Sequence, residues 1–231
     1  MPLMNALLVS CVVLLWASAG GRSAAAWQRR LATAAAAFTL IAPPSCHAAA
    51  PLVGVIAPGF QLRLDQYTSY ATALAREGVV VVQAPADAAG TVGTDAAIVL
   101  DALGKHSAAV PLLVGHSRGG AVMALAAAVE AAATDAPSPY LALLDPVDMA
   151  DGSVLRALAS IRQNNVPARV LVVSLPYGGY SAYYKTAYES ACAPAGRNGE
   201  AFYTAYASAL SPRSALHVTV QNAGHLQLLD R

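Results

Sequence analysis

The chain has 231 residues, a formal net charge of +1 and a hydrophobic fraction of 56%. This length suits one catalytic domain, because a single hydrophobic core commonly holds about 100 to 250 residues. Acidic and basic residues are scattered, so there is neither a basic stripe for nucleic acid nor a polybasic patch for anionic lipid. These features favour a neutral, amphiphilic or apolar substrate and argue against a nucleic-acid partner.

Cysteine and histidine spacings give no support for a disulfide framework or a metal site. The sequence has three cysteines: Cys11 and Cys46 lie near the amino terminus, and Cys192 would be alone in a processed chain. Neither a Cys-x-x-Cys nor a His-x-x-x-His spacing occurs. We therefore expect chemistry that uses no metal and no cofactor.

The first fifth of the chain has the pattern of a targeting leader. Residues 5–17 form an apolar run too short to span a bilayer comfortably, and small residues suited to cleavage follow it. A second signal follows, with Arg29 and Arg30, an apolar stretch at 31–42, two prolines and a small-residue end. The first segment is typical of a secretory-type signal and the second of a twin-arginine export signal.

The tandem arrangement resembles the leaders of proteins that enter a plastid and then its thylakoid lumen. The two signals are separated by residues 20–29, which contain no acidic residue. We therefore predict a bipartite leader at 1–50, a catalytic domain at 51–231 and a plastid location, lumenal or associated with the thylakoid membrane. A single membrane anchor or hairpin is the alternative interpretation of residues 1–50.

From residue 52 onward, short apolar runs alternate with stretches of helical period. This alternation predicts an α/β fold with a mostly parallel central sheet and helices on both faces. The expected strands are 52–57, 79–83, 111–114, 141–144, 170–174 and 217–221, and the expected helices are 65–76, 94–103, 118–132, 154–164 and 199–210. Functional groups should gather where the carboxyl ends of the strands meet helix amino termini.

The hexapeptide Gly-His-Ser-Arg-Gly-Gly at 115–120 lies between an expected strand and an expected helix. That context is typical of a nucleophile elbow, in which a strained turn projects the serine and small flanking residues let strand and helix approach. We predict Ser117 as the nucleophile, within an α/β-hydrolase fold. The helix dipole would favour negative charge at the attacked carbonyl. An ordinary strand-to-helix turn with a capping serine is the alternative.

Two backbone N–H groups are candidates for the oxyanion hole. One is that of Arg118, which directly follows the nucleophile. The other should come from the loop after the first strand, where Pro58-Gly59-Phe60 stands, and we assign it to Phe60, whose ring would form a wall of the substrate pocket. Gly59 as a plain turn residue is the alternative reading of this loop.

Activation of the serine requires a histidine late in the chain, after the last strand. His225 fits this position. The other histidines fit less well: His47 is in the leader, His106 ends a helix, and His217 opens the last strand. His116 should point away from the substrate side of the serine and pack or orient the turn.

The acid is expected at an unusual place. The segment that follows the strand at 170–174, Leu-Pro-Tyr-Gly-Gly-Tyr, contains no carboxylate, whereas the strand at 141–144 runs directly into Asp145. A carboxylate at that strand end can reach the same histidine, so we assign Asp145 to hold the tautomer of His225. Asp148 is the second candidate for the catalytic acid. For either aspartate, the alternative is a structural role in an Asx turn before proline. Asp230 is expected to be a surface or capping charge on a carboxyl-terminal helix.

With these residues placed, the sequence resembles the chlorophyllases, plastid enzymes that hydrolyse the phytyl ester of chlorophyll. The resemblance is carried by 115–120, by Leu-Asp-Pro-Val-Asp at 144–148, by Gly-His-Leu-Gln-Leu-Leu-Asp at 224–230, and by Ala-Cys-Ala-Pro at 191–194 with Asn198 and Phe202. It covers nearly everything after residue 52. It implies an α/β-hydrolase that cleaves chlorophyll to chlorophyllide and phytol through Ser117, His225 and Asp145, without a cofactor.

Two features depart from that family. Its usual His-Gly pair in the first oxyanion loop is replaced by Pro58-Gly59-Phe60, which looks like the loop of bacterial polyester and cutinase-type hydrolases. The stretch between Ala84 and Thr94 is also short, which predicts a minimal lid and an open cleft. The sequence therefore predicts the type of reaction, ester hydrolysis, more closely than it predicts the substrate.

Apolar groups expected around the cleft are Phe60, Tyr177, Tyr180 and Leu226, which would accept a tetrapyrrole or phytyl chain. Scattered tyrosines can equally be core or rim residues. A general lipase or cutinase-like esterase is the main competing function. A hydrolase fold that has lost catalysis and binds pigment or lipid is the third.

Overall fold

The computed structural model describes residues 51–83, 90–106, 109–132, 138–148, 152–159, 167, 169–175, 196–210, 214–220 and 224–230. The predicted leader at 1–50 lies outside these residues, as do Tyr177, Tyr180 and Cys192. The predictions made for those positions therefore remain predictions.

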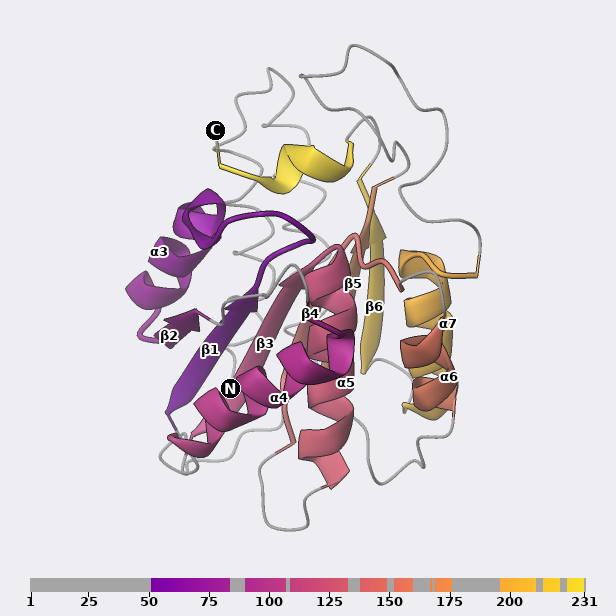
Figure 1. The fold of residues 1–231 in the computed structure, drawn as a ribbon, viewed down its shortest axis with the longest axis horizontal. Coiled ribbons are helices and arrows are strands. Elements are labelled where there is room, and N and C mark those ends of the chain that lie inside the picture. The colour runs from indigo at the N-terminus through magenta and orange to yellow at the C-terminus, as the bar shows by residue number, and fades with distance from the viewer. Residues whose placement is uncertain are drawn as a thin grey trace.

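The described residues form one six-stranded sheet in the order β2-β1-β3-β4-β5-β6, and every neighbouring pair of strands is parallel (Figure 1). The strands are β1 (Leu52–Ala57), β2 (Val80–Gln83), β3 (Val110–His116), β4 (Tyr140–Leu144), β5 (Arg169–Ser174) and β6 (Ala215–Thr219). The strand order reverses between β1 and β3. In open parallel sheets, ligand sites form outside the carboxyl ends of the strands at such a switch point.

Helices cover both faces of the sheet, as the alternating pattern predicts. They are α3 (Thr68–Arg76), α4 (Val92–Gly104), α5 (Arg118–Ala132), α6 (Ser153–Ala159) and α7 (Gly199–Ala209), with short 3-10 helices η1 (Leu64–Tyr67) and η2 (His225–Leu228). Side chains of α4, α5, α6 and α7 share one buried cluster, whereas η1 and α3 belong to the other. In Figure 1, α5 crosses in front of the sheet and α3 lies at its β2 edge.

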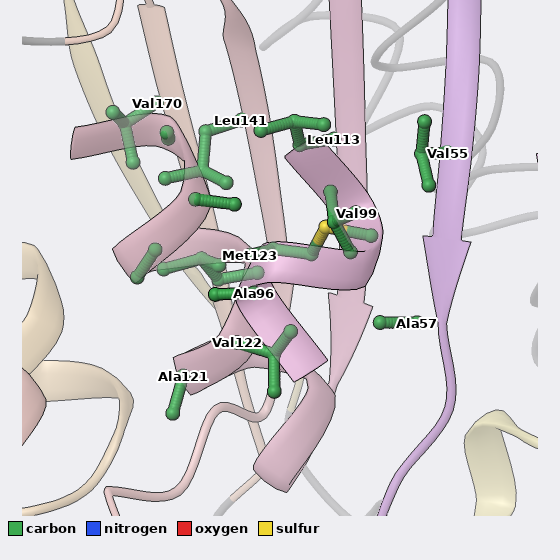
Figure 2. Packing of buried hydrophobic residues seen from close by; sticks show 14 of the residues in the cluster. Val55, Ala57, Ala96, Val99, Leu113, Ala121, Val122, Met123, Leu141 and Val170 are labelled. Atoms are coloured by element: carbon green, nitrogen blue, oxygen red, sulfur yellow. The ribbon is translucent and has the colours of Figure 1, made fainter. Parts of the chain in front are cut away.

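The core consists of two layers because the central strands are buried on both faces. On β3, Leu113 faces the cluster shared with α4 and α5, whereas Leu112 and Val114 face the cluster shared with α3. This period of two, in a run that is apolar at every position, is typical of parallel strands. Figure 2 shows Met123 and Val122 of α5 among Val55, Leu113 and Leu141 of the strands, together with Val99 and Ala96 of α4.

Helix α5 is buried on nearly all sides as far as Ala127, which its alanine-rich sequence allows. Every residue from Arg118 to Ala124 is buried, and so are Ala126 and Ala127. Alanine has the highest helix propensity and the small volume needed for a helix to lie close to the sheet. The amino end of α5 is thereby held rigidly against the carboxyl end of β3.

Several predicted boundaries differ from the structure. The single helix expected at 65–76 is η1 followed by α3. Helix α6 is described as far as Ala159, and the rest of the helix predicted at 154–164 lies outside the described residues. The last strand was predicted to begin at His217, but β6 runs from Ala215 to Thr219 because it pairs in parallel with Val170 to Ser174 of β5. Pairing with a neighbour sets these ends, and local sequence does not encode it.

Among the described residues, no helix combines the length and the apolar character needed to cross a membrane.

Candidate active site

Ser117 is the single residue that connects β3, which ends at His116, to α5, which begins at Arg118. Its backbone is in the left-handed conformation, with φ of 55°. This conformation is strained for a residue with a side chain, and such strain is concentrated at functional turns. The Ser117 N–H donates to the carbonyl of Leu144 at 3.0 Å, and the Ser117 carbonyl accepts from Val147 N–H at 3.1 Å. The loop after β4 therefore holds the turn in its strained shape.

Glycines beside Ser117 allow the backbone to close this turn. A Cβ atom at Gly115 would lie 2.3 Å from the Gly119 carbonyl oxygen, and one at Gly119 would lie 2.4 Å from the Ala57 and Pro58 oxygens. Neither site can hold a side chain without backbone movement. The prediction that small residues here let strand and helix approach is confirmed.

Asp145 and His225 are brought together at the carboxyl edge of the sheet. The Nδ1–H of His225 donates to Oδ2 of Asp145 at 2.6 Å, and both side chains are buried. The other oxygen of Asp145 accepts from the N–H of Leu175 at 3.0 Å, and the backbone of Asp145 has a φ of 44°. A carboxylate that accepts from Nδ1–H leaves Nε2 as the basic nitrogen of the imidazole.

Asp148, the reserve acid, has a different partner. Its Oδ2 accepts from the N–H of Leu155 at 2.8 Å, in the first turn of α6. A carboxylate in this position satisfies a helix N–H that has no intrahelical acceptor and complements the helix dipole. Of the two aspartates, the structure brings Asp145 to His225 and Asp148 to a helix terminus.

The loop after β1 lies directly against the nucleophile. A Cβ atom at Gly59 would stand 3.1 Å from Cβ of Ser117 and 3.3 Å from Nδ1 of His116. Phe60 is 45% exposed, and no hydrogen-bond partner for its N–H occurs among the described residues. Arg118 is the first residue of α5, so its N–H has no acceptor within the helix. Arg118 is thus next to Ser117 in the sequence, and Phe60 follows Gly59, which approaches Ser117; their roles as oxyanion donors stay predictions.

The side chain of Arg118 is buried and has partners of its own. It forms a buried ion pair with Asp95 of α4 and donates to the carbonyl of Gly90 at 2.6 Å. Only the backbone of Arg118 was predicted to have a role, and Asp95 was not predicted to have one. The available signal was a carboxylate in the first turn of an otherwise apolar helix face, which requires a partner when buried.

His116 packs beneath the site, as predicted, but its partners were not foreseen. Its Nδ1 lies 2.7 Å from the hydroxyl of Tyr67, and its Nε2 lies 3.0 Å from the carbonyl oxygen of His225. Burial lowers the pKa of His116 well below its usual value, and the nearby His225 lowers it further. Tyr67 lies 49 residues earlier in the chain, so no local pattern pointed to it.

His217 and His106 stand apart from Ser117. His217 lies within β6, where its Nε2 is 2.8 Å from Oγ of Ser174 and its ring stacks on Tyr203 at 5.0 Å. Burial lowers the pKa of His217. No carboxylate among the described residues hydrogen-bonds its ring, so this second Ser–His pair lacks the third member that His225 has. His106 follows the end of α4.

The predicted substrate pocket is only partly within the described residues. Phe60, in the loop after β1, and Leu226, which follows His225 in η2, are 45% and 36% exposed. Tyr177 and Tyr180 lie outside the described residues, as do 84–89 of the segment predicted to make a minimal lid. In the part of the chain that the structure describes, no three histidine, cysteine or acidic side chains group as metal ligands would.

No protein-family model matches this sequence, and neither does any curated protein. Solved structures do match. The protein described with the metagenome-derived lipolytic enzymes LipS and LipT is 11% identical, covers 79% of this chain and 89% of its own, and has a TM-score of 0.55. Est1E from Butyrivibrio proteoclasticus is 18% identical, covers 79% and 82%, and has a TM-score of 0.50.

TT1662 from Thermus thermophilus is similar at 16% identity, covers 77% of this chain and 83% of its own, and also has a TM-score of 0.50. These neighbours agree with the parallel sheet and its helices on both faces. The chain has the α/β-hydrolase fold.

Proposed function

We propose that the protein is a serine carboxylic-ester hydrolase with Ser117 as nucleophile, His225 as base and Asp145 as acid. The observation that carries the proposal is a buried hydrogen bond of 2.6 Å from Nδ1–H of His225 to the carboxylate of Asp145. It lies at the same edge of the sheet as Ser117, whose backbone conformation is strained. A serine needs an oriented base to become nucleophilic at neutral pH, and that base needs a fixed tautomer.

In the first half of the reaction, Ser117 Oγ bonds to the ester carbonyl carbon while its proton passes to Nε2 of His225. The carbonyl electron pair moves to oxygen, and the N–H groups of Phe60 and Arg118 stabilise that charge. Asp145 stabilises the imidazolium. When the carbon–oxygen bond to the alcohol breaks, the alcohol leaves with the proton from His225.

Water completes the cycle. His225 removes a proton from water as the hydroxide oxygen bonds to the acyl carbon, and the same donors stabilise the second oxyanion. Ser117 then leaves with the proton that His225 returns to it, and the carboxylic acid is released. Protons and electron pairs balance within these groups, so the proposed mechanism includes no metal and no cofactor.

We further propose that the substrate is the phytyl ester of chlorophyll. The support is the resemblance at the elbow, the acid segment and the histidine segment, together with the exposed apolar side chains Phe60 and Leu226 beside the site. Tyr177 and Tyr180 remain predicted pocket residues. The alcohol released would be phytol and the acid chlorophyllide.

A general lipase or cutinase-like esterase is the second candidate, because Pro58-Gly59-Phe60 departs from the chlorophyllase loop. A structural neighbour described as lipolytic fits this candidate, although at 11% identity it carries only the fold. A binding protein for pigment or lipid that does no chemistry is the third candidate. It predicts that Ser117 is dispensable.

The experiment compares chlorophyll a with p-nitrophenyl butyrate as substrates for the full-length protein in detergent micelles. Ser117→Ala should lower turnover at least about 1,000-fold, because the nucleophile cannot be replaced by its neighbours. Ser208→Ala, which removes an exposed serine hydroxyl from α7, is the matched control and should act like the wild type.

The three candidates give different results. Chlorophyllide release that depends on Ser117 supports the chlorophyllase proposal. Hydrolysis of the butyrate ester alone replaces it with the general esterase. If neither ester is cleaved and chlorophyll binds equally well to wild type and Ser117→Ala, the enzyme proposal is wrong.

We also propose that residues 1–50 direct the protein to the plastid, where it would contact the thylakoid membrane. A fluorescent fusion to residues 1–50 should accumulate in plastids. A double change, Arg29→Lys with Arg30→Lys, should block passage into the lumen but not plastid entry, because only the second signal depends on the arginine pair. Fluorescence outside plastids would contradict the proposal.

A further inference from the structure

We infer that Tyr67 and His116 are positioning residues that hold the oxyanion loop and the histidine loop in fixed relation on either side of Ser117. The inference rests on the proposed ester hydrolysis and extends it to two side chains that take no part in bond making. The oxyanion loop is residues 58–60, and the name histidine loop is used for residues 224–226, which include the start of η2.

Three hydrogen bonds form a continuous chain from Gly59 to His225, and the chemistry of each atom fixes which partner donates. The carbonyl oxygen of His225 can only accept, so Nε2 of His116 donates to it at 3.0 Å. Nδ1 of the same neutral ring must then accept, and it accepts from the hydroxyl of Tyr67 at 2.7 Å. The Tyr67 oxygen in turn accepts from the N–H of Gly59 at 3.1 Å.

Each end of this chain touches a group in the proposed mechanism. Gly59 immediately precedes Phe60, the proposed oxyanion donor, and a Cβ atom built on Gly59 would stand 3.1 Å from Cβ of Ser117. The ring of His116 lies against the ring of His225, with centroids 4.6 Å apart. This series of hydrogen bonds therefore links the oxyanion loop to the segment that carries the base, through the residue that precedes the nucleophile.

Burial makes the chain rigid and keeps it neutral. Tyr67 and His116 are each 1% exposed. Burial raises the pKa of Tyr67 and lowers the pKa of His116, so both stay uncharged at neutral pH. A protonated His116 would present Nδ1–H to the Tyr67 hydroxyl, which would then lose the acceptor for its own proton.

Positioning matters here because oxyanion stabilisation depends steeply on geometry. The donors must already stand about 2.7–3.1 Å from the place where the oxyanion forms, and a misplacement of 1 Å can cost on the order of 100-fold in rate. Removing the Tyr67 hydroxyl frees Gly59 N–H on one side and leaves His116 Nδ1 without a donor on the other. Both loops can then shift.

The first test is Tyr67→Phe in the full-length protein, which removes one hydroxyl and keeps the ring. We expect kcat for p-nitrophenyl butyrate to fall about 10- to 100-fold with KM changed less than about twofold, because the donors act on the transition state. Tyr206→Phe is the matched control. That tyrosine is also 1% exposed, but its hydroxyl donates to the Ala124 carbonyl of α5, so kcat should stay within about twofold.

The second test uses two replacements of His116. The side-chain amide of His116→Gln can still donate to the carbonyl of His225, whereas His116→Leu has no donor. We expect His116→Gln to keep at least about ten times more kcat than His116→Leu, measured well below the unfolding midpoint of either variant. Equal losses in both variants, or a change in KM alone, would overturn the inference.

A readout that needs no turnover separates this inference from the proposed function. We expect the amide hydrogen of Gly59 to exchange at least about tenfold faster in Tyr67→Phe than in Tyr206→Phe, because the hydroxyl that protects it is gone. If wild type and Ser117→Ala hydrolyse esters equally, the proposed function fails. If the Gly59 amide exchanges at the same rate in Tyr67→Phe, or if Tyr67→Phe leaves the kcat of an active enzyme unchanged, the inference itself is wrong.

Discussion

Two histidines stand in ring contact at the site but have opposite electrostatic surroundings. His225 donates to the carboxylate of Asp145, which stabilises a positive imidazole. His116 is enclosed by Tyr67, a backbone carbonyl and the ring of His225, with no carboxylate bonded to it among the described residues. Burial therefore keeps His116 neutral, which spares His225 from a like charge at the moment when it takes a proton.

This difference predicts a pH dependence of stability. Because burial lowers the pKa of His116 below 6.5, the unfolded chain binds a proton in mildly acidic solution that the folded chain does not. The free energy of unfolding should therefore fall as pH drops below about 6.5, by up to about 1.4 kcal/mol per pH unit from this group.

Urea unfolding of wild type and His116→Gln at pH 7 and pH 5 measures the effect. The variant should lose less stability between the two pH values, and His217, whose pKa is also lowered, is present in both proteins. Equal losses in the two proteins would show that His116 is not the group responsible.

The two aspartates after β4 allow a test of the acid. Asp145→Asn should lower kcat on the order of 10,000-fold, because an amide favours the wrong tautomer of His225. Asp148→Asn is its matched control, since that buried carboxylate bonds Leu155 N–H of α6. It should cost about 0.5–2 kcal/mol of stability and leave kcat within about threefold. Ester hydrolysis by the purified variants checks both, and a reversed ranking would move the acid to Asp148.

At the scale of elements, the start of α5 is fastened to α4 by the ion pair of Arg118 with Asp95. Both side chains are almost completely buried, and Arg118 also bonds the carbonyl of Gly90 ahead of α4. The pair joins the helix that follows the nucleophile to the connection between β2 and β3. It thereby fixes the backbone N–H of Arg118 that we propose as an oxyanion donor.

Breaking this pair should be costly. Asp95→Ala leaves a buried guanidinium without its counterion and is expected to lower the free energy of unfolding by about 3–5 kcal/mol. Asp101→Ala on the same helix removes an exposed pair with Lys105 and should change it by less than about 1 kcal/mol. Denaturant titration of both variants provides the measurement. Similar changes in the two variants would contradict the role given to Arg118 and Asp95.

At the scale of the whole molecule, the carboxyl-terminal segment closes back onto the first helices. Asp230 accepts from the N–H of Ser69 at 2.7 Å and from its hydroxyl, and the Asp230 N–H donates to the Gln66 carbonyl at 2.9 Å. The hydroxyl of Tyr70 donates to the Leu228 carbonyl at 2.8 Å. In Figure 1 this segment, in yellow, lies above the strand ends and reaches toward α3. These contacts hold the loop that carries His225.

Loss of this closure should destabilise the protein measurably. Asp230→Ala removes a carboxylate that caps the amino end of α3 from 161 residues away and should cost about 0.5–2 kcal/mol. Glu77→Ala, at the exposed carboxyl end of the same helix, should stay within about 0.5 kcal/mol of wild type. Thermal unfolding followed by circular dichroism would detect the difference. An unchanged midpoint for Asp230→Ala would mean that the segment is not anchored there.

Sequence patterns predicted the fold because they reflect local rules. Apolar runs with Val, Leu and Ile mark buried parallel strands, and helix α5 was predicted with its observed bounds from an alanine-rich stretch that follows an elbow motif. Asp230 was expected to be a surface or capping charge on a carboxyl-terminal helix; it bonds the amino end of α3 instead, and the helix near it is the 3-10 helix η2, which ends at Leu228. The boundary of β6 was missed because it depends on pairing with β5.

The α/β architecture, the turn that carries Ser117 and the candidate acid and base could be predicted from the amino-acid sequence, because apolar runs and motif spacing involve residues that are neighbours in the chain. The packing of separate elements brings Asp145 to His225 and Asp148 to the amino end of α6. It also decided the partners of Arg118 and His116, since Asp95 and Tyr67 approach them only when separate elements dock. Burial, which shifts a pKa or raises the cost of an unpaired charge, arises from that docking and not from neighbouring residues in the chain.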